Sequence, residues 1–192
     1  METIKTISAI LSVIIGTVAF YPYIRDIFLK RTQPHSYTWL IWGLTQGVAV
    51  AGLWYGNGGL GALELTVGTA LVFVVFLFSL KYGTKNITRN DTIVLIIAFL
   101  AIFVWWQLDN PVLAVIMVSV VDAVGFIPSI RKSWVEPWSE TISSWALFSI
   151  GNLFAIIALA DYNLLTLTYL ITITVGNIAI LMICVWRRRQ IV

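Results

Sequence analysis

The chain has 192 residues, of which 59% are hydrophobic and 11% are charged, and its mean hydropathy is +0.92. Soluble domains carry charge on roughly a quarter of their residues, so this composition excludes an ordinary soluble domain. The net charge of +3 does not call for a nucleic-acid partner, because basic loops on one side of a membrane produce the same excess. With a single cysteine, neither a disulfide framework nor a cysteine-rich metal site is available.

Seven apolar segments follow one another along the chain, and each is close to the length of about 20 residues that a helix needs to cross a bilayer. They occupy residues 4–24, 36–56, 59–80, 91–108, 111–131, 141–160 and 163–186. The connections between them are short and leave no room for a soluble catalytic domain. We therefore predict an all-α integral membrane protein with seven transmembrane helices and no enzymatic activity.

The basic residues indicate how these helices are oriented. Apart from Lys5, every Lys and Arg residue falls on one side of the alternating segments. Cytoplasmic loops retain positive charge during insertion, so the amino terminus is expected outside and the carboxyl terminus inside. The expected location is the inner (cytoplasmic) membrane of the cell.

The second half of the chain repeats features of the first half at an offset of 106 residues. Under this offset Trp39 aligns with Trp145, and a run around Pro22 aligns with a run around Pro128. A unit of three spans ends on the side opposite to its start, so a further helix must restore the direction before the unit is repeated. We predict a first three-helix repeat over 1–88, an inversion helix over 89–109 and a second, parallel repeat over 110–192. Parallel repeats are a transporter design, with the substrate near the middle of the bilayer.

Two segments carry a family resemblance. They read FYPYIRDIFLKRTQPHSY at 20–37 and FIPSIRKSWVEPWSETIS at 126–143. Each has a proline and a basic residue near the inner end of a repeat's first helix, and then a Ser or Thr before the next helix. In these features the chain resembles the PQ-loop superfamily. It is most similar to the members built from three helices, one inversion helix and three further helices, such as the SWEET sugar transporters and the PnuC vitamin transporters. It departs from the family pattern after each proline, where Tyr23 and Ser129 replace the usual Gln.

The resemblance implies a carrier for a small polar solute, which is a sugar, a vitamin such as nicotinamide riboside, or an amino acid. Two complete halves make one chain sufficient for such a carrier, and a homo-oligomer is compatible with it. The lipid bilayer is the other expected partner. No cofactor is implied.

The prolines are candidate hinges. A proline inside a helix leaves the carbonyl four residues earlier without its backbone donor, so the helix is weaker there. We expect Pro22 and Pro128 to face the bundle interior near the cytoplasmic end. Movement at an inner gate and a static kink are equally compatible with this pattern.

Polar residues near the middle of the spans are candidate substrate contacts. Gln46, Asn152 and Asn177 each lie at mid-depth, where polar side chains are expensive and usually have a purpose. Asp122 lies about twelve residues into its span, and an ionised carboxylate there needs a cation, a proton or a cage of hydrogen bonds. We expect the three amides to converge on one cavity with Asp122 beside them, where Asp122 is either a proton-coupling group or a polar substrate contact. The alternative for the amides is hydrogen bonding between helices.

Two further residues complete the candidate site. Trp42 lies one helical turn from Gln46 and is a candidate aromatic wall against which a sugar or nucleoside ring could stack. The alternative is that Trp42 faces lipid or packs against other helices. Glu64 lies a few residues inside the third span, where it would line an outer vestibule or form a solvated carboxylate at a helix start. His35, the only histidine, lies in an inner loop, so a histidine-based metal site is excluded.

Other seven-span functions fit the sequence less well. A retinal protein needs a buried lysine, whereas all lysines fall at span ends or in loops. An intramembrane aspartyl protease needs paired deep carboxylates, and only Asp122 is expected at that depth. A non-transporting membrane sensor or accessory protein remains the alternative to a carrier, and it would pack the same polar residues without a cavity.

Overall fold

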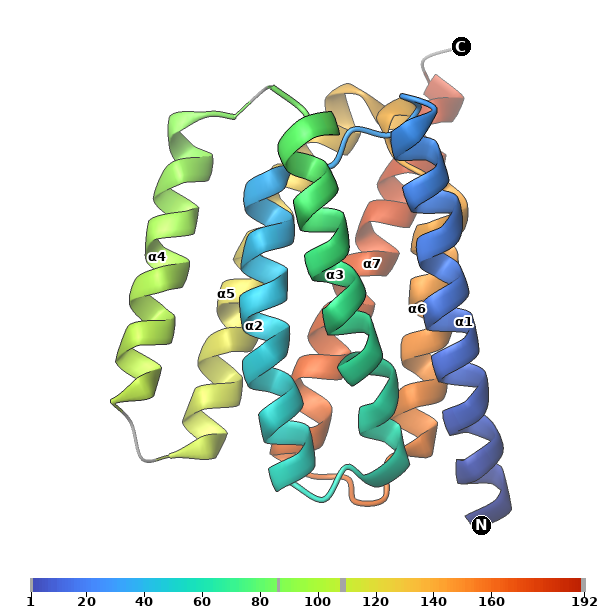
Figure 1. Ribbon diagram of the computed structural model, residues 1–192, viewed down its shortest axis with the longest axis vertical. Coiled ribbons are helices and arrows are strands. Elements are labelled where there is room, and N and C mark those ends of the chain that lie inside the picture. The colour runs from blue at the N-terminus through green and yellow to red at the C-terminus, as the bar shows by residue number, and fades with distance from the viewer. Residues whose placement is uncertain (1, 86, 108–109, 191–192) are drawn as a thin grey trace.

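The apolar segments form long helices in the computed structural model, which describes residues 2–85, 87–107 and 110–190. Every regular element within these residues is a helix, so the predicted all-α fold is confirmed (Figure 1). The elements are α1 (Glu2–Phe28), α2 (Ser36–Tyr55), the 3₁₀ helix η1 (Gly59–Ala62), α3 (Leu63–Tyr82), α4 (Arg89–Trp106), α5 (Pro111–Val135), the 3₁₀ helix η2 (Pro137–Ser139), α6 (Ile142–Ala158) and α7 (Leu164–Gln190).

The observed helices follow the predicted spans, with differences at the ends. α1, α5 and α7 continue about one turn past the last predicted residue, because backbone hydrogen bonds persist after the apolar composition has given way to basic side chains. The third span begins with a 3₁₀ turn instead of an α-helix. The predicted end of the fourth span, residue 108, lies outside the described residues, as does 109.

Four stretches of the described helices are long and apolar enough to cross a membrane, namely Glu2–Phe28, Gly59–Tyr82, Pro111–Val135 and Leu164–Gln190. α6 is apolar but has only 17 residues. Large apolar side chains such as Ile10, Val74 and Val175 are exposed along the outside of the bundle. A soluble protein would leave such side chains in water, so this surface is compatible with a multi-pass membrane protein.

Two groups of three helices, α1–α3 and α5–α7, make corresponding contacts, and the most extensive contact of all, between α1 and α6, lies between the groups. α3 packs against both α1 and α2, and α7 packs against both α5 and α6. The groups meet where α1 packs against α6 and α2 packs against α5. α4 lies at the edge of the bundle and touches only α2 and α5 among the described elements (Figure 1).

The two termini lie at opposite ends of the bundle (Figure 1). Arg25, Lys81, Lys132 and the run 187–189 lie where α1, α3, α5 and α7 end, at the top of Figure 1. We call this the basic end and the opposite one the far end.

The two prolines differ in their surroundings. Pro128 is buried, as the expectation of an interior position requires, whereas Pro22 is only half-buried. Both α1 and α5 continue as helices through their proline. The interior placement is thus correct for α5 and only partly so for α1, whose outer side lies on the surface of the bundle.

Candidate functional site

A cavity of about 50 Å³ lies inside the bundle, between the two groups of helices. Six of the seven α-helices contribute to its wall, and no described residue of α4 does. Its lining residues are Phe20, Trp39, Trp42, Gln46, Glu64, Leu65, Gly68, Val72, Asp122, Phe126, Trp145, Phe148, Asn152, Ile173 and Asn177. The cavity lies between two clusters of buried apolar side chains, and residues of both line it. The cluster toward the basic end is mostly aromatic and includes Phe20, Trp42 and Trp145. The cluster toward the far end is mostly aliphatic and includes Leu65 and Ile173.

The polar residues that the sequence places at mid-depth all line this cavity. Gln46 comes from α2, Asp122 from α5, Asn152 from α6 and Asn177 from α7. Asn152 and Asn177 are buried, and Gln46 is half-buried and accepts a weak hydrogen bond of 3.4 Å from Thr69. Four helices thus each turn one of their deep polar side chains toward one space.

Asp122 is fully buried beside the cavity. Its Oδ1 accepts hydrogen bonds from the Thr45 hydroxyl at 2.5 Å and from the Tyr169 hydroxyl at 2.6 Å. Its Oδ2 has no hydrogen-bond partner among the described residues. One half of the carboxyl group is therefore held in place by α2 and α7, and the other half is free to bind something else.

Glu64 corrects the sequence interpretation. It is buried, with 7% of its surface exposed, so the expectation of a solvated helix-start carboxylate is wrong. It lines the central cavity, and the outer vestibule stays a prediction. Gly16 of α1 explains the burial. A β-carbon added to Gly16 would lie 2.6 Å from Glu64 Oε1, so the glycine lets α1 lie directly over the Glu64 side chain.

Three polar atoms of the cavity residues are buried and have no hydrogen-bond partner within the described part of the chain: Trp42 Nε1, Glu64 Oε2 and Asp122 Oδ2. A buried donor or acceptor without a partner costs about 1–3 kcal/mol. Three of them around one cavity indicate a place where a polar molecule or water completes the hydrogen bonds.

Aromatic side chains form the wall of the cavity toward the basic end. Trp42 packs against Phe126 with ring centroids 4.6 Å apart, and Phe20 packs against Phe148 at 4.8 Å. Trp145 lies 6.0 Å from Trp42. The sequence interpretation included only Trp42 in this wall. The 106-residue offset, which aligns Phe20 with Phe126 and Trp39 with Trp145, was the signal available for the others.

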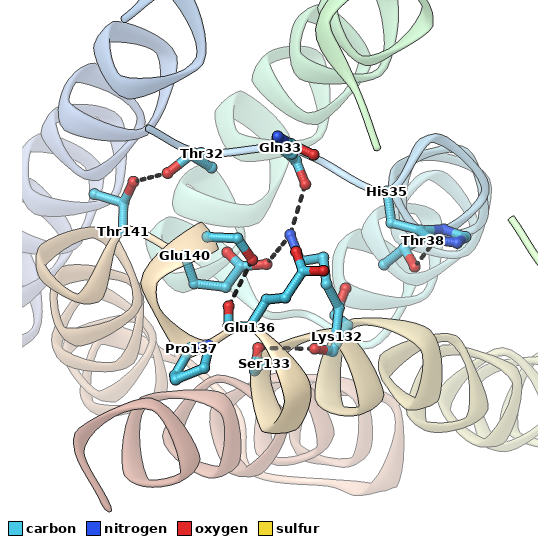
Figure 2. A network of polar contacts seen from close by, with 12 residues as sticks. Thr32, Gln33, His35, Thr38, Lys132, Ser133, Glu136, Pro137, Glu140 and Thr141 are labelled. Carbon is cyan, nitrogen blue, oxygen red and sulfur yellow. Dashed lines mark hydrogen bonds and ion pairs between the residues drawn. The ribbon is translucent and has the colours of Figure 1, made fainter. Parts of the chain in front are cut away.

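Beyond this aromatic wall, a network of polar contacts joins the loop after α1 to the segment between α5 and α6 (Figure 2). Lys132 and Glu140 form an ion pair with an Nζ–Oε1 distance of 2.5 Å, and both side chains are buried. Lys132 Nζ also donates a hydrogen bond of 2.6 Å to the Gln33 carbonyl. The Thr32 and Thr141 hydroxyls share a second link of 2.5 Å between the same two segments.

Trp145 connects this network to the cavity. Its ring lines the cavity, and its Nε1 donates a 3.0 Å hydrogen bond to Glu140 Oε2. Arg188 of α7 donates to the Glu140 backbone carbonyl at 2.6 Å. We call Gln33, Lys132, Glu140 and Trp145 the basic-end lock. The residue pattern does not predict this lock, because it indicates Lys132 only as one of the charges that orient the protein.

His35 is part of the same end but does not reach the cavity. Burial lowers the pKa of His35 below its usual value, although the neighbouring Asp91 acts in the opposite direction. In the neutral ring, Nε2–H donates to Asp91 Oδ2 at 3.3 Å and Nδ1 accepts from the Thr38 hydroxyl at 3.4 Å. Arg131 also binds this oxygen, at 3.1 Å, so Asp91 ties α4 to α5 and to the loop before α2.

No family model matches the chain, and no curated protein or solved structure is significantly similar to it. The resemblance to the PQ-loop superfamily therefore rests on the two proline segments. Within the described residues, no group of three or more His, Cys, Asp or Glu side chains is placed to hold a metal ion. The functional interpretation depends on the cavity itself.

Proposed function

We propose that the protein is a membrane carrier that moves a small polar solute across the inner membrane by alternating access to the central cavity. The observation that supports this most directly is the convergence of Asp122, Asn152 and Asn177, from three helices, on a cavity whose buried polar atoms are partly unpaired. Polar groups of this kind in the middle of a membrane usually mark a substrate pathway.

The proposal includes seven spans and two parallel repeats, 1–88 and 110–192, joined by an inversion helix over 89–109. Packing supports the repeats, because α3 stands between α1 and α2 as α7 stands between α5 and α6. Aromatic contacts support them as well. Adding 106 to Phe20 and Trp42 gives Phe126 and Phe148, so the Phe20–Phe148 contact of 4.8 Å corresponds to the Phe126–Trp42 contact of 4.6 Å.

The size of the cavity bears on the mechanism. A water molecule needs about 10–15 Å³ on the same measure, so a cavity of about 50 Å³ has room for a few waters. A carrier must therefore widen this cavity during its cycle. The basic-end lock closes one side of it, and Pro22 and Pro128 are the proposed hinges.

The small size of the cavity favours a second candidate, a sensor or accessory protein that does not transport. In such a protein the small cavity would be a permanent feature, and the polar residues would serve to hold the helices together. The PQ-loop-like carrier remains our first proposal, because helices held together by these groups would pair Trp42 Nε1 and Asp122 Oδ2, and the described residues leave both atoms unpaired.

Uptake into proteoliposomes tests the carrier. We expect one member of a panel of sugars, vitamins and amino acids to accumulate, and Asn177→Ala to reduce the rate by about tenfold, the effect of a lost contact of about 1.4 kcal/mol. Asn90→Ala, at an exposed asparagine in the first turn of α4, is the matched control and should keep the wild-type rate. Binding of a panel member without any uptake would contradict the carrier and favour the sensor.

A further inference from the structure

The cavity is acidic. Two carboxyl side chains, Glu64 from α3 and Asp122 from α5, line it, and no Lys, Arg or His is among the described lining residues. Glu64 Oε2 and Asp122 Oδ2 are both buried and unpaired. Lys132 of the basic-end lock is bound to Glu140 and to the Gln33 carbonyl, so it does not pair with either carboxyl group.

The rest of the wall suits a positive charge too. The face of an aromatic ring attracts a cation, and tryptophan does so most strongly. Trp39, Trp42 and Trp145 all line the cavity, with Trp42 5.3 Å from Trp39 between ring centroids. Trp42 Nε1 is an unpaired donor, so it would hydrogen-bond a hydroxyl or carbonyl oxygen of the same solute.

We propose that the solute is a small organic cation, an amine or quaternary ammonium compound that also carries a hydrogen-bond acceptor. Its positive charge lies against Glu64 and Asp122, its apolar part contacts the tryptophan rings, and its oxygen accepts from Trp42. This inference rests on the proposed binding function of the cavity and specifies its substrate class. A cation pairs with the ionised carboxylates, whereas a neutral sugar or an anion requires these buried groups to take up protons.

Matched pairs of solutes test the charge directly. Choline and its neutral carbon analogue 3,3-dimethylbutan-1-ol have the same shape and hydroxyl group, and acetylcholine and 3,3-dimethylbutyl acetate, which share an ester carbonyl, form a second pair. Titration calorimetry on the purified protein should give at least tenfold tighter binding of the cation in one or both pairs. Equal binding of cation and neutral analogue would overturn the proposal.

Variants then identify the groups that recognise the charge. Glu64→Gln and Asp122→Asn keep the shape and one acceptor oxygen each, and each should weaken cation binding at least tenfold without changing the binding of the neutral analogue. Asp161→Asn removes an exposed carboxylate of the far-end loop and should leave both unchanged. Unaltered cation affinity in both cavity variants would contradict the inference.

A third solute separates this inference from the proposed function. If glucose or another neutral solute binds and is taken up while no cation binds, the substrate class is wrong and the carrier stands. If neither the cations nor the neutral solutes bind, both proposals fail.

Discussion

At the scale of single residues, the cavity depends on small side chains as much as on polar ones. Gly16 and Gly68 show the difference between the two uses of glycine. A β-carbon on Gly16 would meet Glu64 Oε1 at 2.6 Å, whereas a β-carbon on Gly68 would have no atom within 4 Å, although Gly68 lines the cavity. Gly16 is thus required by its neighbour, and Gly68 is not.

This contrast gives a matched pair of substitutions. Gly16→Ala should displace the Glu64 carboxyl group and lower the free energy of unfolding by about 1–3 kcal/mol, the usual effect of overpacking. Gly68→Ala should leave stability unchanged or raise it by up to about 1 kcal/mol, because alanine reduces the freedom of the unfolded chain. Denaturant titration in detergent micelles measures both. Equal effects of the two substitutions would show that Glu64 is not held against α1.

At the scale of elements, the basic-end lock joins the two groups of helices through the hydrogen bond from Lys132 of α5 to the Gln33 carbonyl, and a buried ion pair with Glu140 holds Lys132 in place. Removing one partner of such a pair leaves a buried charge without compensation and costs about 3–5 kcal/mol. Lys132 and Glu140 are both buried, so solvent cannot replace the lost partner. Opening the lock therefore separates Lys132 from the Gln33 carbonyl, while the ion pair with Glu140 stays within the second group of helices.

A double-mutant cycle tests this element. Lys132→Met should lower the free energy of unfolding by about 3–5 kcal/mol, and Lys132→Met combined with Glu140→Gln should recover most of it. Lys85→Met, at an exposed lysine of the same end, is the control. Cys184 is buried in the aromatic cluster of that end and serves as a reporter, since an opened lock should speed its reaction with a maleimide. An unchanged labelling rate in Lys132→Met would contradict a gating role.

At the scale of the whole molecule, the distribution of charge fixes the expected orientation. All Lys and Arg residues except Lys5 belong to the basic end or its loops, and the two termini lie at opposite ends. A chain that crosses the membrane an odd number of times has its two termini on opposite sides. The orientation rule then places the basic end in the cytoplasm.

Cysteine labelling in intact cells tests this orientation. In a Cys184→Ser background, Asp161→Cys at the far end should react with an impermeant maleimide, and Lys85→Cys at the basic end should react only after the cells are permeabilised. Both positions are exposed, so access depends on the side of the membrane and not on burial. The reverse pattern would show that the protein has the opposite orientation. Labelling of both cysteines in intact cells would show that the chain crosses the membrane fewer times than proposed.

The sequence alone determined the helical fold and most of the cavity-lining polar residues. Hydrophobic length locates helices without knowledge of their neighbours, and counting along a helix places Gln46, Asp122, Asn152 and Asn177 at similar depth. The tertiary structure decided the rest. Glu64 became a cavity residue because Gly16 brings α1 over it, and Lys132 became part of a lock because Glu140 lies opposite it. Depth is a property of one helix, but burial and pairing depend on which faces of different helices meet, and the spacing of residues along the chain does not specify that.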